Sequence, residues 1–293
     1  MNIISPNIAG IITIVIWSIS PLLVIYSGET PPFLMASIAL FIASMLLITK
    51  YLFIDKSNQV MAMRQPFKSY LINLYGIGGY ILFWFLAFKN APAFEANILN
   101  YLWPILLVFL SLVLSIEKFH INKLLGILLG FSGLTLLFIS QLNFDLIYLT
   151  GYVFAIMGAF IWASYSIMLK KIEMQNGSMA YFMLLPAILF LCLHLRFEEA
   201  YLPTKIEFIF LILLGFSRIS FALWNHAMNK GNIPFIAALA YFIPITSTFL
   251  IYLAGFTPRN EHIALGAVLV LLGCITVNFN SIKKIYNEKR KHC

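Results

Sequence analysis

Ten apolar stretches follow one another along this chain of 293 residues, and only short connections separate them. A helix needs about 17 to 25 apolar residues to cross a bilayer, and each stretch is close to that length. Inside lipid a backbone must satisfy its own hydrogen bonds, which a helix does. The sequence therefore predicts an all-α membrane protein with ten transmembrane helices. The expected spans are Ile8–Tyr26, Pro32–Thr49, Ser69–Phe88, Ala93–Ile116, Leu124–Ser140, Gly151–Leu169, Met179–Leu195, Ile206–Ala227, Pro234–Ala254 and His262–Ile282.

The composition supports this class and excludes a soluble one. Hydrophobic residues make up 61% of the chain and charged residues 10%, whereas a soluble domain carries about 25% charged residues. The net charge of +8 does not indicate a nucleic-acid partner, because the basic residues are spread over short loops and one tail. The expected macromolecular environment is the lipid bilayer.

The basic residues set a topology. If the N-terminus is cytoplasmic, fourteen of the nineteen fall in inside loops or in the tail that begins at Lys283. Four fall outside, and the last, Arg218, lies within a span. By the positive-inside rule, both termini are expected in the cytoplasm. The tail is interpreted as an anchor that contacts anionic lipid.

The third to fifth spans recur in the eighth to tenth at a shift of 140 residues. At that shift Trp84, Tyr101, Pro104, Gly126 and Gly133 match Trp224, Tyr241, Pro244, Gly266 and Gly273; at a shift of 145, Trp17 matches Trp162. Each half has five spans, an odd number, so the second half enters the membrane upside down. We expect two inverted five-helix repeats, residues 1–141 and 142–293, around a site at mid-membrane. The alternative is ten helices whose glycines match by chance.

A polar stripe runs along the fourth span. At 100° per residue, Asn97, Asn100, Tyr101 and Pro104 fall on one helical face. Pro104 leaves the carbonyl of Asn100 without its helical donor, so that carbonyl and the Asn97 amide are candidates to bond a substrate. The alternative is a proline kink whose amides are satisfied by a neighbouring helix.

Two charged residues lie within predicted spans. Arg218 is near the middle of Ile206–Ala227, where a guanidinium stays charged and must be solvated, paired or functional. It suits a substrate carboxylate, through two parallel hydrogen bonds. A structural role, bonded to helix carbonyls or paired with Glu95, is the alternative. Glu95 itself is interpreted as a first-turn residue favoured by the helix dipole, with proton carriage as the alternative.

Aromatic residues form 16% of the chain, and the repeat brings many of them toward the centre. A cavity walled by aromatic faces suits a flat or cationic ligand. Trp84 and Trp224 fall late in their spans, which is typical of tryptophans at the membrane interface. The candidates for the centre also include Trp17, Tyr80, Tyr101, Trp103, Trp162, Tyr165 and Tyr241.

Motifs of enzymes are not found. There is no Walker A loop, no H-E-x-x-H pair and no nucleophile elbow, and the three cysteines lack metal spacing. We expect no cofactor, no bound metal and no enzymatic activity. An intramembrane enzyme that acts on lipid would need an acid, base or nucleophile set at one depth, and the sequence offers none.

The segment Glu95-Ala96-Asn97-Ile98-Leu99-Asn100-Tyr101-Leu102-Trp103-Pro104 carries a family resemblance. Together with the ten spans and the inverted repeat, it resembles the EamA branch of the drug/metabolite transporter superfamily, and in particular YddG-type exporters. The resemblance covers the whole chain. It implies a place in the bacterial inner membrane, a central cavity and export of aromatic amino acids, with planar cationic drugs as further candidates. By resemblance, the cavity or gate residues are Trp17, Tyr80, Tyr101, Trp103, Pro104 and Trp162.

These observations predict a secondary transporter that exports aromatic or other hydrophobic amino acids by alternating access. The predicted substrate-binding residues are Trp17, Tyr80, Asn97, Asn100, Tyr101, Trp103, Pro104, Trp162, Tyr165, Arg218 and Tyr241. The main alternative is a carrier of another small metabolite or cationic drug, such as a nucleotide derivative or quaternary amine. A membrane scaffold without transport is a third reading. We expect a monomer, with a dimer as the alternative.

Overall fold

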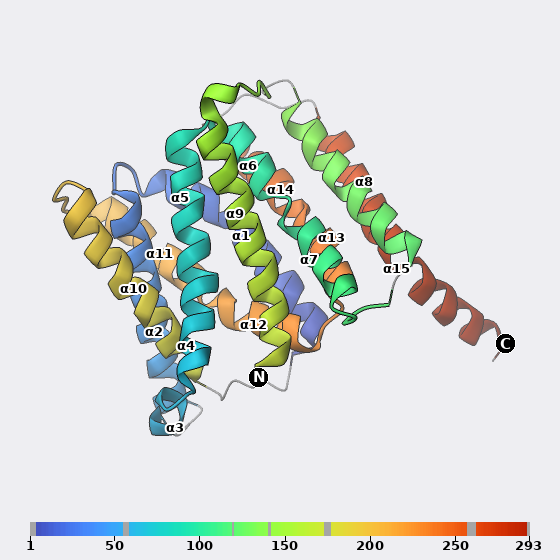
Figure 1. The fold of residues 1–293 in the computed structure, drawn as a ribbon, viewed down its shortest axis with the longest axis horizontal. Helices are drawn as coiled ribbons and strands as arrows, with labels where there is room; N and C mark the ends of the chain where they lie inside the picture. The colour runs from blue at the N-terminus through green and yellow to red at the C-terminus, as the bar shows by residue number, and fades with distance from the viewer. Residues whose placement is uncertain are drawn as a thin grey trace.

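The computed structural model describes residues 4–54, 59–118, 120–139, 142–172, 177–256 and 262–291. These residues form a bundle of helices (Figure 1). Lys56 and the side chains of the basic tail from Lys283 onward lie outside what the structure describes. The cytoplasmic placement of the termini therefore stays a prediction.

The first half contains α1 (Pro6–Tyr26), α2 (Pro32–Phe53), α3 (Gln59–Met63), α4 (Phe67–Asn73), the π-helical η1 (Leu74–Gly79), α5 (Tyr80–Asn90), α6 (Ala93–Asn100), α7 (Trp103–Val113) and α8 (Ile121–Phe138). The second contains the 3₁₀ turn η2 (Leu146–Tyr148), α9 (Leu149–Met168), the 3₁₀ turn η3 (Leu169–Lys171), α10 (Ser178–Phe197), α11 (Lys205–Arg218), α12 (Ser220–Lys230), α13 (Ile233–Ala240), α14 (Phe242–Leu253) and α15 (Ile263–Lys291).

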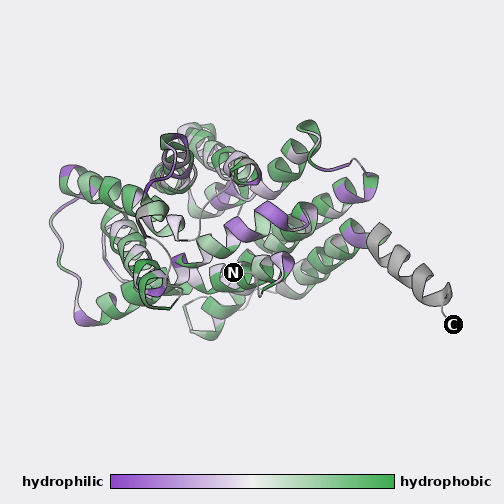
Figure 2. Cartoon of the chain, turned by 90° about the horizontal axis from the view of Figure 1, so that it is seen from below, coloured by the Kyte–Doolittle hydropathy of each residue, from purple (hydrophilic) through white to green (hydrophobic). Residues whose placement is uncertain are grey.

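The prediction of a ten-helix membrane protein is confirmed. In the described part of the chain, nine helical segments are long and apolar enough to cross a membrane, and α15 contains a shorter apolar segment, Ala264–Phe279. Hydrophobic colour covers most of the helices in Figure 2, with polar residues mainly at helix ends and in connections. Val15, Phe41 and Phe109 are exposed well inside their helices, as suits a surface covered by lipid.

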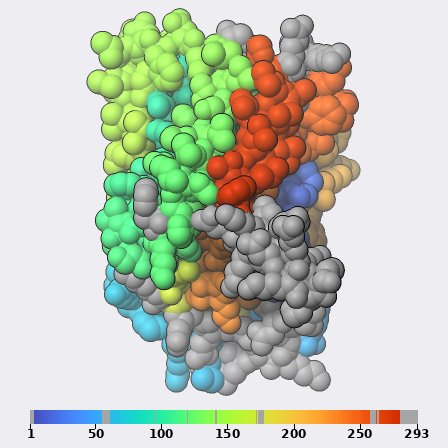
Figure 3. Space-filling model, turned by 90° about the vertical axis from the view of Figure 1, so that its right-hand side faces the viewer, coloured from blue at the N-terminus to red at the C-terminus, as the bar shows by residue number. Residues whose placement is uncertain are grey.

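The α8–α15 pair links the two halves through four glycines. A side chain on Gly126 would lie 2.5 Å from the carbonyl oxygen of Gly273, and one on Gly133 would lie 2.6 Å from that of Gly266. Since the shift of 140 pairs Gly126 with Gly266 and Gly133 with Gly273, each contact is the copy of the other. That reciprocity is the signature of a local two-fold axis. Figure 3 shows α8 and α15 lying side by side on this flank.

The spans at the centre are interrupted at equivalent points of the two halves. In the third span the interruption is the π-helical η1, which ends at Gly79; in the eighth it falls at Ile219, which the shift pairs with Gly79. The fourth span breaks after α6 at Tyr101, and the ninth breaks at its partner Tyr241. Interrupted helices at mid-depth are typical of the binding region of a transporter.

Candidate functional site

A cavity of about 840 Å³ lies inside the bundle, next to the C-terminal part of α1 and the N-terminal part of α2. On α1 it is lined from Trp17 onward, on α2 only as far as Leu40, and on α14 up to Ile251. The fourth span contributes the segment Ala93–Trp103, and Arg218 and Phe221 border the cavity from either side of the α11–α12 break. Pockets for small ligands usually measure about 300 to 1,000 Å³, so this one is large enough for a small metabolite.

Most of the predicted site residues meet here, and three do not. The cavity is lined by Trp17, Tyr80, Asn97, Asn100, Tyr101, Trp103, Trp162 and Arg218. Pro104 is buried at the start of α7 beside the lining, while its repeat partner Pro244 does line the cavity. Tyr165 lies against Gly76 and donates a hydrogen bond of 2.8 Å to Asn73 Oδ1.

Tyr241 is also outside the lining, although its partner Tyr101 is in it. Its ring packs against Gly130, where a side chain would come within 2.5 Å of it. The residue that the repeat pairs with Gly130 is Val270, which is fully buried. Tyr241 thus has a glycine to pack against, whereas the equivalent position for Tyr101 is a valine, and Tyr101 lines the cavity. We interpret this difference in neighbour size as the reason why the two tyrosines differ.

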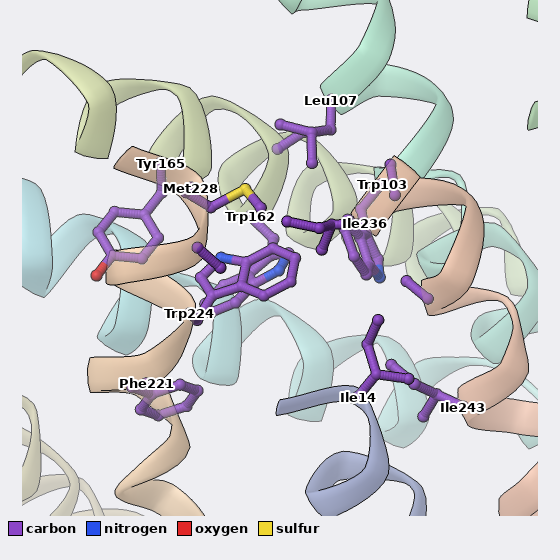
Figure 4. Close-up of a cluster of buried hydrophobic side chains, with 14 of the residues drawn as sticks. Ile14, Trp103, Leu107, Trp162, Tyr165, Phe221, Trp224, Met228, Ile236 and Ile243 are labelled. Carbon is purple, nitrogen blue, oxygen red and sulfur yellow. The ribbon is translucent and has the colours of Figure 1, made fainter. Parts of the chain in front are cut away.

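Four of the five tryptophans lie at the end of the cavity that is nearer the start of α1. Trp17, Trp103, Trp162 and Trp224, here called the indole floor, come from α1, α7, α9 and α12. The Trp17 ring centroid lies 5.5 Å from that of Trp162 and 5.0 Å from that of Trp224. Figure 4 shows Trp162 beside Trp224, with Trp103 on one flank and Tyr165 on the other. Both halves of the chain thus contribute to one closed layer.

Two hydrogen bonds hold the indole floor in place. Trp17 donates through Nε1 to Ser220 Oγ over 2.9 Å. Trp224 donates through Nε1 to Ser166 Oγ over 3.0 Å. Buried indole N–H groups need such partners, and these two join α1 to α12 and α9 to α12.

Sequence reasoning missed two tryptophans of the site. It left an interface position open for Trp84 and Trp224 and kept both out of the predicted site, but Trp84 lines the cavity and Trp224 is 1% exposed in the indole floor. Trp224 is central because the rings of Trp17, Trp103 and Trp162 pack around it. The usable signal was their pairing at a shift of 140, which placed both next to the interrupted parts of their spans.

The polar groups of the first half gather around Asn100. This side chain is 2% exposed, and its Oδ1 accepts a 3.1 Å hydrogen bond from the Tyr80 hydroxyl. Its amide nitrogen lies beside Gly158 and has no partner among the described residues. Asn97 lines the cavity one helical turn earlier. The stripe expected on the fourth span therefore faces the bundle interior.

Arg218 brings a charge to the opposite wall. It is the last residue of α11, and its guanidinium carbon lies 5.9 Å from the ring centroid of Phe221. Among the ion pairs and hydrogen bonds of the described residues, none involves Arg218. Glu95 is buried elsewhere, and its Oε1 accepts a 2.5 Å hydrogen bond from the Asn143 backbone. The two residues do not form the pair that the sequence left open.

A polytopic helical bundle with an aromatic-lined cavity between interrupted helices is typical of carriers of small molecules. The model of the EamA-like transporter family matches residues 4–139 and again 149–279. The chain belongs to the EamA-like transporter family, and its apolar helices make it a multi-pass membrane protein, consistent with a bacterial inner membrane. The family match indicates a transporter rather than an enzyme.

Named relatives and a solved structure agree with this assignment. The chain is 30% identical to the aromatic amino acid exporter YddG of Ancylobacter novellus over 275 residues, covering 92% of this chain and 95% of that protein. It is 29% identical to YddG of Salmonella typhimurium, covering 62% and 66%. A solved crystal structure matches with a TM-score of 0.89 at 28% identity, over 95% of this chain and 98% of that one.

Proposed function

We propose that this protein exports aromatic and other hydrophobic amino acids across the bacterial inner membrane by alternating access. The observation that carries the proposal is a cavity closed on one side by four indoles and walled by further aromatic rings. Aromatic faces hold a flat side chain by stacking, which contributes about 0.5 to 1.5 kcal/mol per ring pair beyond the apolar area buried. The names of the two YddG relatives support the same substrate class.

The aromatic side chain of the substrate lies between Tyr80, Trp103 and Trp162 in this proposal, and its charged ends meet Asn97, Asn100 and Arg218. With both termini in the cytoplasm, the cavity opens toward the outside and the indole floor is the inner gate. Release to the outside needs no further opening in this state. Loading from the cytoplasm requires the floor to part.

Parting the floor has a definite structural meaning. The indoles belong to two helices of each half, so a rocking motion of one half against the other pulls Trp17 away from Trp162. It also breaks the Trp17–Ser220 hydrogen bond, which joins α1 to α12. The ligand supplies replacement stacking contacts while the indoles are apart, which favours movement of the loaded carrier.

Flux from liposomes tests the proposal. Purified protein is reconstituted into vesicles loaded with labelled phenylalanine, and efflux is compared with that from loaded vesicles without protein. We expect efflux above background that unlabelled tryptophan and tyrosine inhibit. No efflux for any aromatic amino acid, with and without a pH gradient, would remove the substrate assignment. A quaternary amine and a nucleotide sugar in the same competition panel detect a carrier of another metabolite.

A matched pair of variants distinguishes a loss of transport caused by the indole floor from a loss caused by general destabilisation. Trp103→Ala removes a ring of the indole floor, and we expect it to abolish most of the flux. Phe109→Ala removes a ring from the same helix, but one that is 58% exposed on the lipid side. It should transport normally. Equal loss in both variants would contradict the assigned role of the floor.

A further inference from the structure

The charge of the cavity is one-sided. Of the described residues that line it, Arg218 carries a full charge, and none is an aspartate or glutamate. Glu95, in the first turn of α6, falls within the segment Ala93–Trp103, but its side chain is buried away from the cavity and is not part of the lining. The cavity therefore offers a cation to its ligand and no anion.

The polar groups of the cavity lining that lack a hydrogen-bond partner also favour an anionic ligand. Arg218 has five N–H donors, and no described residue accepts from them. Among the buried polar atoms without a partner in the described part of the chain, one belongs to a lining residue, and it is a donor, Asn100 Nδ2. The Asn100 acceptor is already used by Tyr80. At both residues, the groups that lack a partner among the described residues are therefore donors.

A carboxylate and an ammonium group gain unequally in such a site. The carboxylate replaces its water with a charged, two-pronged donor, which gives the stronger class of hydrogen bond. The ammonium finds neutral acceptors only, and it lies in the field of a like charge. An unpaired guanidinium at this depth is costly, so an anion that pairs with it recovers the largest electrostatic term available here.

We propose that the carboxylate of the ligand is the group that the cavity requires, and that the α-amino group is dispensable. The protein then also binds aromatic carboxylates that lack an amino group, such as arylpropanoates and aryl-2-oxo acids. Aromatic amines without a carboxylate are poor ligands. This inference rests on the proposed function for its aromatic cavity, and it adds the chemical class of ligand.

Three ligands of one shape test it: phenylalanine, 3-phenylpropanoate, which lacks the amino group, and phenethylamine, which lacks the carboxylate. Binding to detergent-purified full-length protein is followed by the indole emission, since Trp17, Trp103 and Trp162 line the cavity. Emission is excited on the red side of the indole band, where these ligands do not absorb. We expect 3-phenylpropanoate to bind within about tenfold of phenylalanine, and phenethylamine at least about tenfold more weakly.

Variants assign the effect to one side chain. Arg218→Gln should weaken both acids at least about tenfold and leave phenethylamine unchanged or tighter. Arg218→Lys, which keeps the charge but loses the two-pronged geometry, should fall between. Arg196→Gln is the matched control, because that arginine also lies over a ring, Phe197, but is exposed at the end of α10. Size-exclusion profiles report whether each variant is folded.

Two results would overturn the inference: phenethylamine binding as well as phenylalanine while 3-phenylpropanoate does not, or folded Arg218→Gln protein with unchanged affinity for both acids. The ligand series on the unaltered protein decides the question even if both arginine variants fail to fold. Binding is measured apart from flux, so the absence of phenylalanine efflux with intact binding of 3-phenylpropanoate would refute the proposed function and not this inference.

Discussion

The two halves of the molecule share a backbone plan and differ in chemistry at the cavity. On the fourth span the lining includes Asn97, Asn100 and Trp103; the ninth has Ala237, Ala240 and Ile243 at those positions. In the other direction, the third span has Gly78 where the eighth has Arg218. Both halves supply rings, but the first half supplies the amides and the second supplies the charge. In the proposed function, a scaffold with two-fold related halves therefore presents different chemistry to the two polar ends of the ligand.

The comparison also shows which residues match between the two halves and which do not. The four glycines at the α8–α15 contact obey the two-fold relation on both sides, because a backbone that packs on a backbone leaves no room for variation. The lining residues carry no such constraint. Substitutions that make one half a copy of the other should therefore alter binding, while substitutions at the glycines should alter folding.

The largest effect is expected from Gly126→Leu. The new side chain would collide with the backbone of α15 at Gly273, and overpacking of this kind costs about 3 kcal/mol or more where backbones must move. A lower unfolding temperature in detergent, or loss of the folded peak, measures it. Gly79→Ala is the control, since its nearest neighbour would be Ile161 at 3.6 Å. Similar melting of Gly126→Leu and the unaltered protein would refute the close contact.

Trp103→Ile copies the second half into the first at the indole floor. It removes the edge contact to Trp224, whose centroid lies 5.6 Å away, and one face available for stacking. We expect the apparent affinity for phenylalanine in counterflow to fall about tenfold, or about 1.4 kcal/mol. Affinity for leucine should change much less. Equal losses for the two ligands would mean that the ring acts only through packing.

Asn100→Ala copies the residue Ala240 in the same way. The Tyr80 hydroxyl then loses its acceptor, and a hydrogen bond between membrane helices contributes about 1 kcal/mol. Transport should fall about fivefold, and Tyr80→Phe should reproduce much of that loss. The double variant should be no worse than the poorer single one, because the two side chains act together. Additive losses would show that each contacts the substrate separately.

The smallest effect is expected from Ser20→Ala, at a polar contact between the halves. Ser20 Oγ lies 3.4 Å from Ser217 Oγ, near the limit for a hydrogen bond, and also donates to the Ile16 carbonyl in its own helix. Stability should change by less than about 0.5 kcal/mol. A larger loss in thermal unfolding would show that this contact contributes substantially to holding α1 against α11.

Much of the fold could be predicted because lipid imposes simple rules. The lengths of the apolar stretches predicted the ten helices. The residues that match at a shift of 140 predicted the repeat, which the reciprocal glycine contacts support. The short α3 and the π-helical η1 were not foreseen, since neither changes the hydropathy of the segment around it. Helical periodicity also placed Asn97, Asn100 and Tyr101 on an inward face correctly, because lone amides are excluded from lipid.

The rest of the site depended on neighbours that no single helix reveals. Tyr241 matches Tyr101 in the repeat, but Gly130 gives its ring a place outside the cavity. Trp224 falls late in its span, yet three other indoles surround its position. In each case the deciding neighbours lie on other helices, and the spacing of residues along one helix does not reveal them.

The glycine contact between α8 and α15 has one mechanical consequence. Where two backbones touch with no side chains between them, there are no rotamers to rearrange and nothing compressible to absorb a displacement. Such a junction resists sliding but permits a small change of crossing angle. This contact can therefore act as a pivot. It lies at one flank of the bundle, and α2 and α10 lie at the opposite flank (Figure 1). A small tilt there becomes a wide excursion at the opposite flank.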